Sequence, residues 1–468
     1  MKEETLSRLK EAAGPRGFTE DVSEIAPHLK EWRSKYVGSS PLMLRPDTTE
    51  QVSRILAICH ETATPLVPQG GNTGLVGGQI PFNGEVLLSL ERLNQVRSVD
   101  VENLSMSVEA GVVLAIAQRS AREHGLMFPL SLAAEGSATI GGNLSTNAGG
   151  VNVLRYGMMR DLVLGLEVVL ADGRILNLMT ALRKNNTGYD LKQLFIGAEG
   201  TLGIITAAVL KMFPDPEVRT TVFVAVPSPA SAVRLLAEMQ SGSGGQICAF
   251  ELIPRIGIDL VTRHIAGVRD PLSKPSPWYV LAEATSAAQF DLNAAIERSL
   301  TSAIESGLAS DATFAKSESQ RTALWSLREH ISEAQKREGA SIKHDISVPV
   351  SAIPAFIERA TAAVLKAAPG ARAVSFGHIG DGNLHFNFNA PIGADGATFL
   401  VRWDEIQRIV HDIVQEFGGS ISAEHGIGVQ KRDQLVHYKS AVEMELMRAL
   451  KRLLDPKNIL NPGKVVAI

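Results

Sequence analysis

Apolar residues in the first 215 positions recur in alternating helical and strand patterns. Thr48 to Gln51 has the form of a capping box, which predicts the start of a helix. Four apolar positions then follow the helical period: Val52, Ile55, Leu56 and Cys59. Short apolar runs between turn residues predict strands at 64–68, 86–90, 105–109 and 162–170, and a further helix is predicted at 112–124. This alternation predicts an α+β domain over residues 1–215.

The pattern changes after Pro214-Asp-Pro216. Residues 220–226 form a fresh apolar strand, and Ser-Pro turns introduce helices with Ala and Leu faces, so a second domain is predicted over 216–418. The remainder, 419–468, is predicted to carry a helix at about 440–454 and a stiff, extended tail, and to pack back on the first domain.

The composition is that of a globular protein. The chain has 468 residues, of which 45% are hydrophobic and 21% charged, with a formal charge of −4, so nothing favours nucleic acid or an anionic membrane as a partner. The two cysteines, Cys59 and Cys248, lie far apart, which argues against a disulfide framework. The first residues alternate charge, and no apolar run approaches the roughly 18–20 residues of a membrane span. We therefore expect a cytoplasmic protein.

Three glycine-rich stretches lie in the first domain, at 68–78, 141–150 and 197–203. Glycine lets consecutive backbone N–H groups approach a phosphate without obstruction by Cβ. The stretches match neither a P-loop nor a Rossmann fingerprint. Convergence on one extended diphosphate accounts for all three, and a flavin dinucleotide has that size.

His378 and His385 flank Asp381-Gly382, a dipeptide typical of a two-residue type I′ hairpin turn. Pairing outward from that turn sets the two histidines opposite each other, about 4.5–5.5 Å apart at Cβ. Glu424 supplies a carboxylate, which gives a divalent-metal site with open positions; zinc and manganese both fit. His425, next to Glu424, is then a candidate base.

These motifs, together with Thr146–Gly157, Trp325–Arg328, Lys343–Pro349 and Asn461–Lys464, resemble the vanillyl-alcohol-oxidase-type (PCMH-type) flavoproteins that have a D-lactate-dehydrogenase-like C-terminal half. The resemblance covers nearly the whole chain. It implies a two-subdomain FAD-binding domain, an antiparallel-sheet substrate domain and a helical C-terminal segment. Relatives that tether flavin through histidine would need it near Asn72, so a non-covalent FAD is implied.

The resemblance also implies site residues. For the substrate these are Arg328, Ser332, Lys343 and Asn387, and a helix through Leu327 and Ile331 would present Arg328 and Ser332 together on another side. The implied metal ligands are His378, His385 and Glu424, with His425 as catalytic base. The implied FAD-binding residues are Pro68, Gly70, Gly71, Asn72, Thr73, Gly74, Gly77, Gly78, Gly136, Ser137, Gly141, Gly142, Thr146, Asn147, Gly149, Val151, Glu199, Gly200, Ile204 and Asn461.

The activity implied is oxidation of D-2-hydroxyglutarate to 2-oxoglutarate, with D-lactate or glycolate as the alternative substrate. The metal would acidify the substrate hydroxyl, His425 would take its proton, and hydride would pass to flavin N5; abstraction of the Cα proton is the competing route. Electron-transferring flavoprotein, a quinone or a cytochrome remain open as acceptor, and a homodimer is the base-rate expectation. A metallohydrolase would leave the glycine stretches unexplained, and a non-catalytic carrier would have no use for His425.

Overall fold

The computed structural model describes residues 2–468 and divides them into two compact units. The first unit holds the chain up to Gly150, Gly157–Asp215 and Glu424–Ile468; the second holds Val151–Tyr156 and Pro216–Ala423. The predicted domain bounds, at 215/216 and 418/419, stay predictions, and they did not include the excursion at 151–156. None of the described helices combines the length and apolar composition needed to cross a bilayer.

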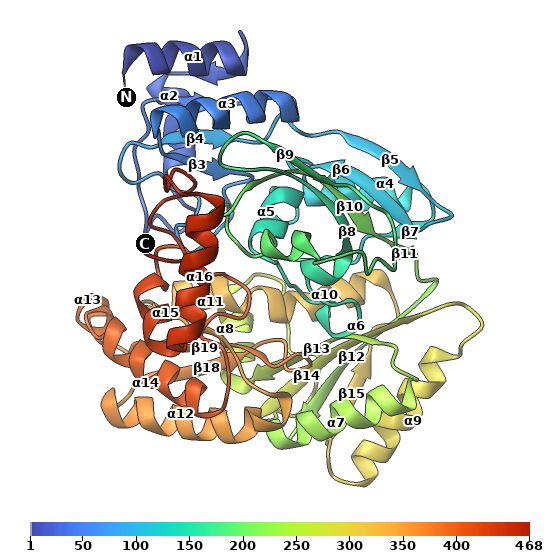
Figure 1. Ribbon diagram of the computed structural model, residues 1–468. Coiled ribbons are helices and arrows are strands. Elements are labelled where there is room, and N and C mark those ends of the chain that lie inside the picture. The colour runs from blue at the N-terminus through green and yellow to red at the C-terminus, as the bar shows by residue number, and fades with distance from the viewer. Residues whose placement is uncertain (1) are drawn as a thin grey trace. The chain divides into compact units, whose positions relative to one another are not determined.

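The first sheet of the first unit is small and mostly parallel. Its order is β1 (Phe18–Thr19), β2 (Met43–Leu44), β4 (Val86–Ser89) and β3 (Leu66–Gln69), and only the β1–β2 pair is antiparallel. Helices α1 (Glu3–Ala13) and α3 (Thr49–Thr62) pack together beside it (Figure 1). The Thr48 hydroxyl caps α3 by accepting the Gln51 N–H, as predicted, and the four apolar positions of α3 are buried in the core. Two short helices precede β2: α2 (Val22–Ile25) and the 3-10 helix Ala26–Leu29.

The second sheet of the first unit is fully antiparallel. Its order is β5 (Val96–Asp100), β6 (Ser105–Glu109), β10 (Ile204–Lys211), β8 (Val163–Val169) and β9 (Ile175–Leu178). Its helices are α4 (Leu114–Arg122) and α5 (Ile140–Ser145), with 3-10 turns at Met159–Leu162 and Leu191–Leu194. A ribbon of β7 (Leu126–Met127) and β11 (Phe213–Pro214) completes the fold.

The C-terminal part of the first unit contains α15 (Arg432–Tyr438) and α16 (Ala441–Leu454). Ser440 and Glu443 form a reciprocal capping box at the start of α16. The tail after α16 was predicted to be extended, which is wrong: Asn458, Asn461 and Val465 have positive φ angles of 50°, 44° and 60°. The chain therefore turns repeatedly, and a bridge pairs Leu460 with Leu66 of β3.

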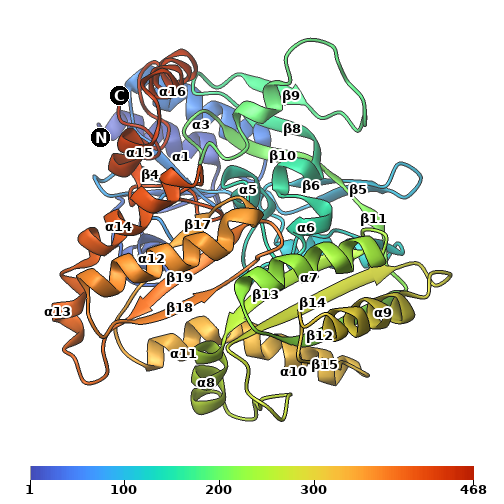
Figure 2. The ribbon, with the colours of Figure 1, turned by 90° about the horizontal axis from the view of Figure 1, so that it is seen from below.

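The second unit begins with a four-stranded antiparallel sheet in the order β13 (Ile247–Pro254), β14 (Trp278–Ser286), β12 (Val218–Val226) and β15 (Asp311–Phe314). Figure 2 shows α7 (Pro229–Gly242) and α9 (Leu292–Glu305) over one face. The other face is covered by α8 (Arg255–His264), α10 (Glu318–Glu329) and α11 (Ile331–Arg337). The short α6 (Val153–Tyr156) packs against β13.

A second sheet in the same unit has β19 (Asn383–Asn389) at its centre, paired with β16 (Ser341–Ile342), β17 (Asp345–Ser347) and β18 (Arg372–Phe376). The remaining helices of the unit are the 3-10 turn Val350–Ala352, α12 (Ile353–Ala367), α13 (Gly396–Leu400) and α14 (Trp403–Glu416). Helices α12 and α14 pack against each other.

The predicted two-residue turn between the histidines is wrong. His385 lies opposite Phe376, not His378, and Asp381 does not have the positive φ that a type I′ turn requires. The cause is a backbone bridge between Gly377 and Leu252 of β13, with N–O distances of 2.8 and 3.1 Å, which ends β18 early. His378 therefore sits on a six-residue loop instead of a ladder position.

Candidate active site

The three glycine-rich stretches converge in the first unit, as predicted. A Cβ on Gly71 would lie 1.8 Å from the Ser137 carbonyl oxygen, so the first stretch can approach the loop before α5 only with glycine there. The second and third stretches are joined by Glu199 N–H, which donates to the Ser145 carbonyl at 2.8 Å. Asn461 closes the set, because its side-chain amide donates to the carbonyls of Gly78 and Glu199 at 2.9 and 2.8 Å.

These loops fit a dinucleotide. Two buried amide atoms in this region, Asn143 Nδ2 and Asn461 Oδ1, have no hydrogen-bond partner among the described residues. Buried polar atoms are nearly always paired, so a bound polar group is expected to meet them. FAD bound here would supply the two-electron redox chemistry.

Several of the predicted FAD-binding side chains have structural partners instead. The Asn72 amide donates to the carbonyls of Pro27 and Lys30 and accepts from Gln79, which holds the first loop closed. Ile204 is buried in the core of the unit. Val151 lies in the second unit, where it packs on the core beneath α10. Contacts of these three with FAD stay predictions.

His378 and His385 come close together in the second unit despite the different turn, with ring centroids 5.8 Å apart. The Nδ1 atom of His378 pairs with the carboxylate of Glu251 on β13, which is fully buried. A carboxylate on one imidazole nitrogen is the usual second partner of a metal-ligating histidine and fixes the orientation of the ring. Asp345, also buried, lies opposite His385 in the β17–β19 register. The donor set therefore fits a divalent metal.

Glu251 also holds the first predicted substrate residue. Its second oxygen accepts from Arg328 Nε at 2.6 Å, and the guanidinium of Arg328 lies 4.8 Å above the ring of Phe376. Burial raises the pKa of Glu251, but the charges of His378 and Arg328 outweigh it and lower the pKa to about 2. Glu251 is therefore ionised and pairs with both His378, a predicted metal ligand, and the guanidinium of Arg328.

The predicted face shared by Arg328 and Ser332 is wrong. Helix α10 ends at Glu329, and His330, with φ −86° and ψ 1°, separates it from α11. Arg328 is buried at the end of the first helix, whereas Ser332 is exposed in the second. A substrate contact of Ser332 stays a prediction.

Asn387 and Lys343 lie near each other along the second sheet. The Asn387 amide is occupied at both ends, since its oxygen accepts from His344 N–H at 3.2 Å and its nitrogen donates to Gln335 at 3.0 Å. Asn387 thus fixes the backbone that follows Lys343. Lys343 itself is half-buried between β16 and β17.

Glu424 and His425 open the segment that returns to the first unit. The backbone after them is held by Glu199, whose oxygens accept from Ile427 and Gly428 N–H at 2.7 and 2.9 Å. Burial raises the pKa of Glu199 to about 7. The two N–H donors favour the ionised form and so limit this increase. That Glu424 completes a metal site with His378 and His385 stays a prediction.

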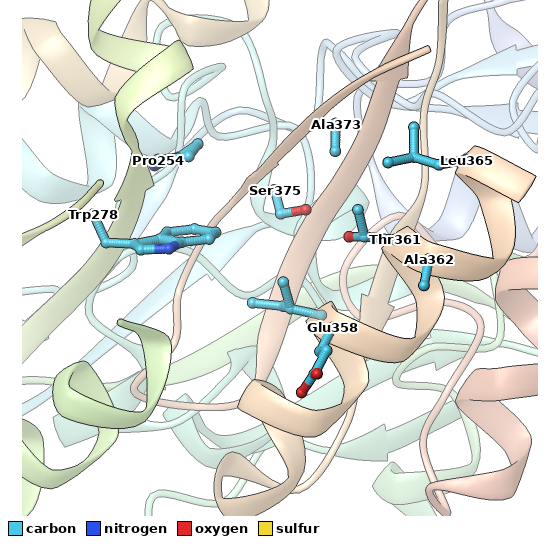
Figure 3. Close-up of a pocket in the computed structure, with 9 residues that line it drawn as sticks. Pro254, Trp278, Glu358, Thr361, Ala362, Leu365, Ala373 and Ser375 are labelled. Carbon is cyan, nitrogen blue, oxygen red and sulfur yellow. The ribbon is translucent and has the colours of Figure 1, made fainter. Parts of the chain in front are cut away.

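A groove of about 430 Å³ in the second unit is not this site. Figure 3 shows Trp278 on one side of it and residues of α12 on the other, with Ser375 of β18 between them. Its lining contains none of the predicted metal, substrate or base residues, and Glu358 is its only charged side chain.

Three residues that lie against predicted site residues were not singled out from the sequence: Glu251 pairs with His378 and Arg328, Gln335 accepts from Asn387, and Asp345 lies opposite His385. The signal for Glu251 was present, because it is the one charged residue in the otherwise apolar strand Ile247–Pro254. A buried charge in such a strand requires a partner.

Two family models match the chain. Residues 41–179 match the family described as FAD binding domain, and residues 215–465 match FAD linked oxidases, C-terminal domain. Three relatives named D-2-hydroxyglutarate dehydrogenase span nearly the whole chain. The Arabidopsis thaliana relative is 40% identical over 98% of this chain and 81% of its own length; that of Bos taurus is 40% identical over 100% and 84%. The Xanthomonas citri pv. viticola relative is 37% identical over 99% and 97%.

Solved structures establish the fold. p-Cresol methylhydroxylase with substrate bound aligns with a TM-score of 0.76, 18% identity and coverage of 99% of this chain and 96% of its own. Alkyldihydroxyacetonephosphate synthase aligns with a TM-score of 0.72, 18% identity and coverage of 99% and 85%. These matches confirm the predicted vanillyl-alcohol-oxidase-type FAD-binding fold.

The comparisons correct the predicted cellular compartment. The relatives from A. thaliana and B. taurus are named mitochondrial, so the prediction of a cytoplasmic protein is wrong. The two distant cysteines argued only against a disulfide framework, and that is compatible with more than one compartment. The matches to both family models and to relatives along nearly the whole chain agree with the convergence of the glycine-rich loops. The chain therefore belongs to the family of FAD-linked oxidases and is an FAD-dependent oxidoreductase.

Proposed function

We propose that this FAD-dependent hydroxy-acid dehydrogenase oxidises D-2-hydroxyglutarate to 2-oxoglutarate with the help of a divalent metal. Identity of about 40% along the chain to relatives named for that activity supports the substrate. The observation that carries the proposal is the double role of Glu251, which orients His378 for a metal and holds the Arg328 guanidinium in the same buried cluster. A Lewis acid at the hydroxyl and a cation at a carboxylate would each assist the oxidation of a 2-hydroxy acid.

Each residue has a defined task in this proposal. His378, His385 and Glu424 would hold the metal, zinc or manganese, which polarises the substrate hydroxyl when bound. Arg328 offers a planar fork to one carboxylate, and Lys343 a point charge to the other. His425 takes the hydroxyl proton as general base. A non-covalently bound FAD would supply the hydride acceptor, its N5, for this oxidation.

D-lactate and glycolate are the alternative substrates, since the same metal and base chemistry would serve them. They lack a distal carboxylate, so the proposed role of Lys343 favours the dicarboxylate. The electrons are proposed to leave through a separate acceptor, such as electron-transferring flavoprotein, a quinone or a cytochrome, and a homodimer is the expected assembly.

Anaerobic mixing of the FAD-loaded protein with a panel of 2-hydroxy acids tests the substrate. D-2-hydroxyglutarate is expected to bleach the visible flavin absorbance faster than D-lactate or glycolate at equal concentration. The L-enantiomer is the matched control and is expected to leave the flavin oxidised. Equal rates for D-lactate and D-2-hydroxyglutarate would contradict the dicarboxylate proposal.

A further inference from the structure

The carboxylate of Glu199 is directed at backbone, although the residue lies in a glycine-rich loop predicted to bind the cofactor. Its two oxygens accept from Ile427 and Gly428 N–H at 2.7 and 2.9 Å. These donors stand two and three residues after His425. Glu199 is buried and has a φ of 50°, a conformation that is uncommon for a residue with a side chain.

Two glycines, Gly78 and Gly426, pack closely against this carboxylate. A Cβ on Gly426, which has φ 81°, would lie 2.7 Å from one Glu199 oxygen. A Cβ on Gly78 would lie 2.9 Å from the other oxygen. Gly78 and Gly426 therefore contact the carboxylate through backbone atoms, and a side chain at either position would collide with it.

Glu199 is itself fixed from two sides. Its N–H donates to the Ser145 carbonyl at 2.8 Å, and its carbonyl accepts from the Asn461 amide at 2.8 Å. The segment after His425 is thus tied to the same loops that are expected to hold the flavin. A carboxylate that accepts two backbone N–H groups makes stronger hydrogen bonds than a neutral acceptor would.

We infer that Glu199 is a positioning residue for His425: it fixes the Gly426–Gly428 backbone and thereby the orientation of the base relative to the cofactor loops. The inference rests on the proposed role of His425. It also accounts for an acidic side chain in a loop otherwise suited to a diphosphate, since both carboxylate oxygens accept from backbone N–H groups.

Amide hydrogen exchange of the peptide containing residues 424–431 tests the contact without any turnover. Glu199→Gln keeps the shape but places an NH₂ group against one of the two donors, so exchange at Ile427 or Gly428 is expected to accelerate by about tenfold or more. Glu85→Gln is the matched control: Glu85 is also buried and also accepts a backbone N–H, that of Asn83 at 2.7 Å. Unchanged protection in Glu199→Gln would overturn the inference, and Glu199→Ala repeats the test with both contacts removed.

A double-mutant cycle on the anaerobic rate of flavin reduction tests the functional link. Glu199→Gln alone is expected to slow reduction by about tenfold with FAD content and KM nearly unchanged, because a displaced base affects the chemical step. In the His425→Ala background, Glu199→Gln is expected to have no further effect. Full additivity would overturn the inference while leaving the base intact. A normal rate in His425→Ala alone would remove the base itself, and the inference with it.

Discussion

Replacing Glu251 with glutamine is expected to weaken the metal site and the substrate site together. The carboxylate is fully buried and pairs with Arg328 and His378. Removing one member of a buried ion pair costs about 3–5 kcal/mol, because the partner charge stays buried without compensation. Glutamine still offers one oxygen, so we expect about 3 kcal/mol, which corresponds to a fall in Tm of roughly 6–12 °C for a unit of this size. Loss of the carboxylate behind a metal-ligating histidine lowers metal affinity by about 10–100-fold.

Glu283→Gln is the matched control for this experiment. Glu283 is buried in the neighbouring strand β14 and pairs with Arg219 and Arg321, with N–O distances of 2.9 and 2.7 Å. Both variants are expected to lower Tm in calorimetry, but only Glu251→Gln should also lose metal in equilibrium dialysis and raise the KM for D-2-hydroxyglutarate. Wild-type metal affinity and KM in a folded Glu251→Gln protein would refute the dual role of Glu251.

Three further predictions concern single side chains. His425→Ala is expected to lower the rate of flavin reduction by about 10²–10⁴, the usual contribution of a positioned base, and a near-normal rate in stopped flow would exclude that role. Lys343→Ala should raise the KM for D-2-hydroxyglutarate more than that for D-lactate, with the exposed Lys366→Ala as control; equal changes would mean that Lys343 does not bind the distal carboxylate. Hydrogen bonds from Arg372, His264 and Arg263 lower the pKa of Glu338 from its usual 4.5 to about 2, so its contribution to stability is present above pH 4.5 and lost as the pH falls through 2. The Tm difference between wild type and Glu338→Gln should therefore shrink between pH 6 and pH 3, and a constant difference would contradict this.

Much of the first unit could be predicted from local sequence. The capped helix at Thr48, the strand at Ser105–Glu109 and the convergence of the glycine stretches all depend on short-range patterns, and the structure has each of them. The sequence also predicted that His378 and His385 lie close together, and their ring centroids are 5.8 Å apart, although the turn that joins them differs from the predicted one.

What could not be predicted depends on contacts between distant residues. The turn before His385 is six residues long because Gly377 bridges to Leu252, which is 125 positions earlier in the chain. The break at His330 ends a helical pattern that continues through Ile331 in the sequence. Glu251 gains its role only because β13 passes beneath the loop of His378 and the end of α10, and strand patterning does not record such a crossing.

Removal and restoration of the metal tests the account as a whole. The FAD-loaded protein would be stripped with a chelator, its FAD content measured, and flavin reduction by D-2-hydroxyglutarate followed anaerobically before and after addition of zinc or manganese. We predict that the stripped protein keeps its FAD, is not reduced by the substrate, and recovers with one equivalent of metal in wild type but not in His385→Ala. Full-rate reduction of the stripped protein would contradict the account.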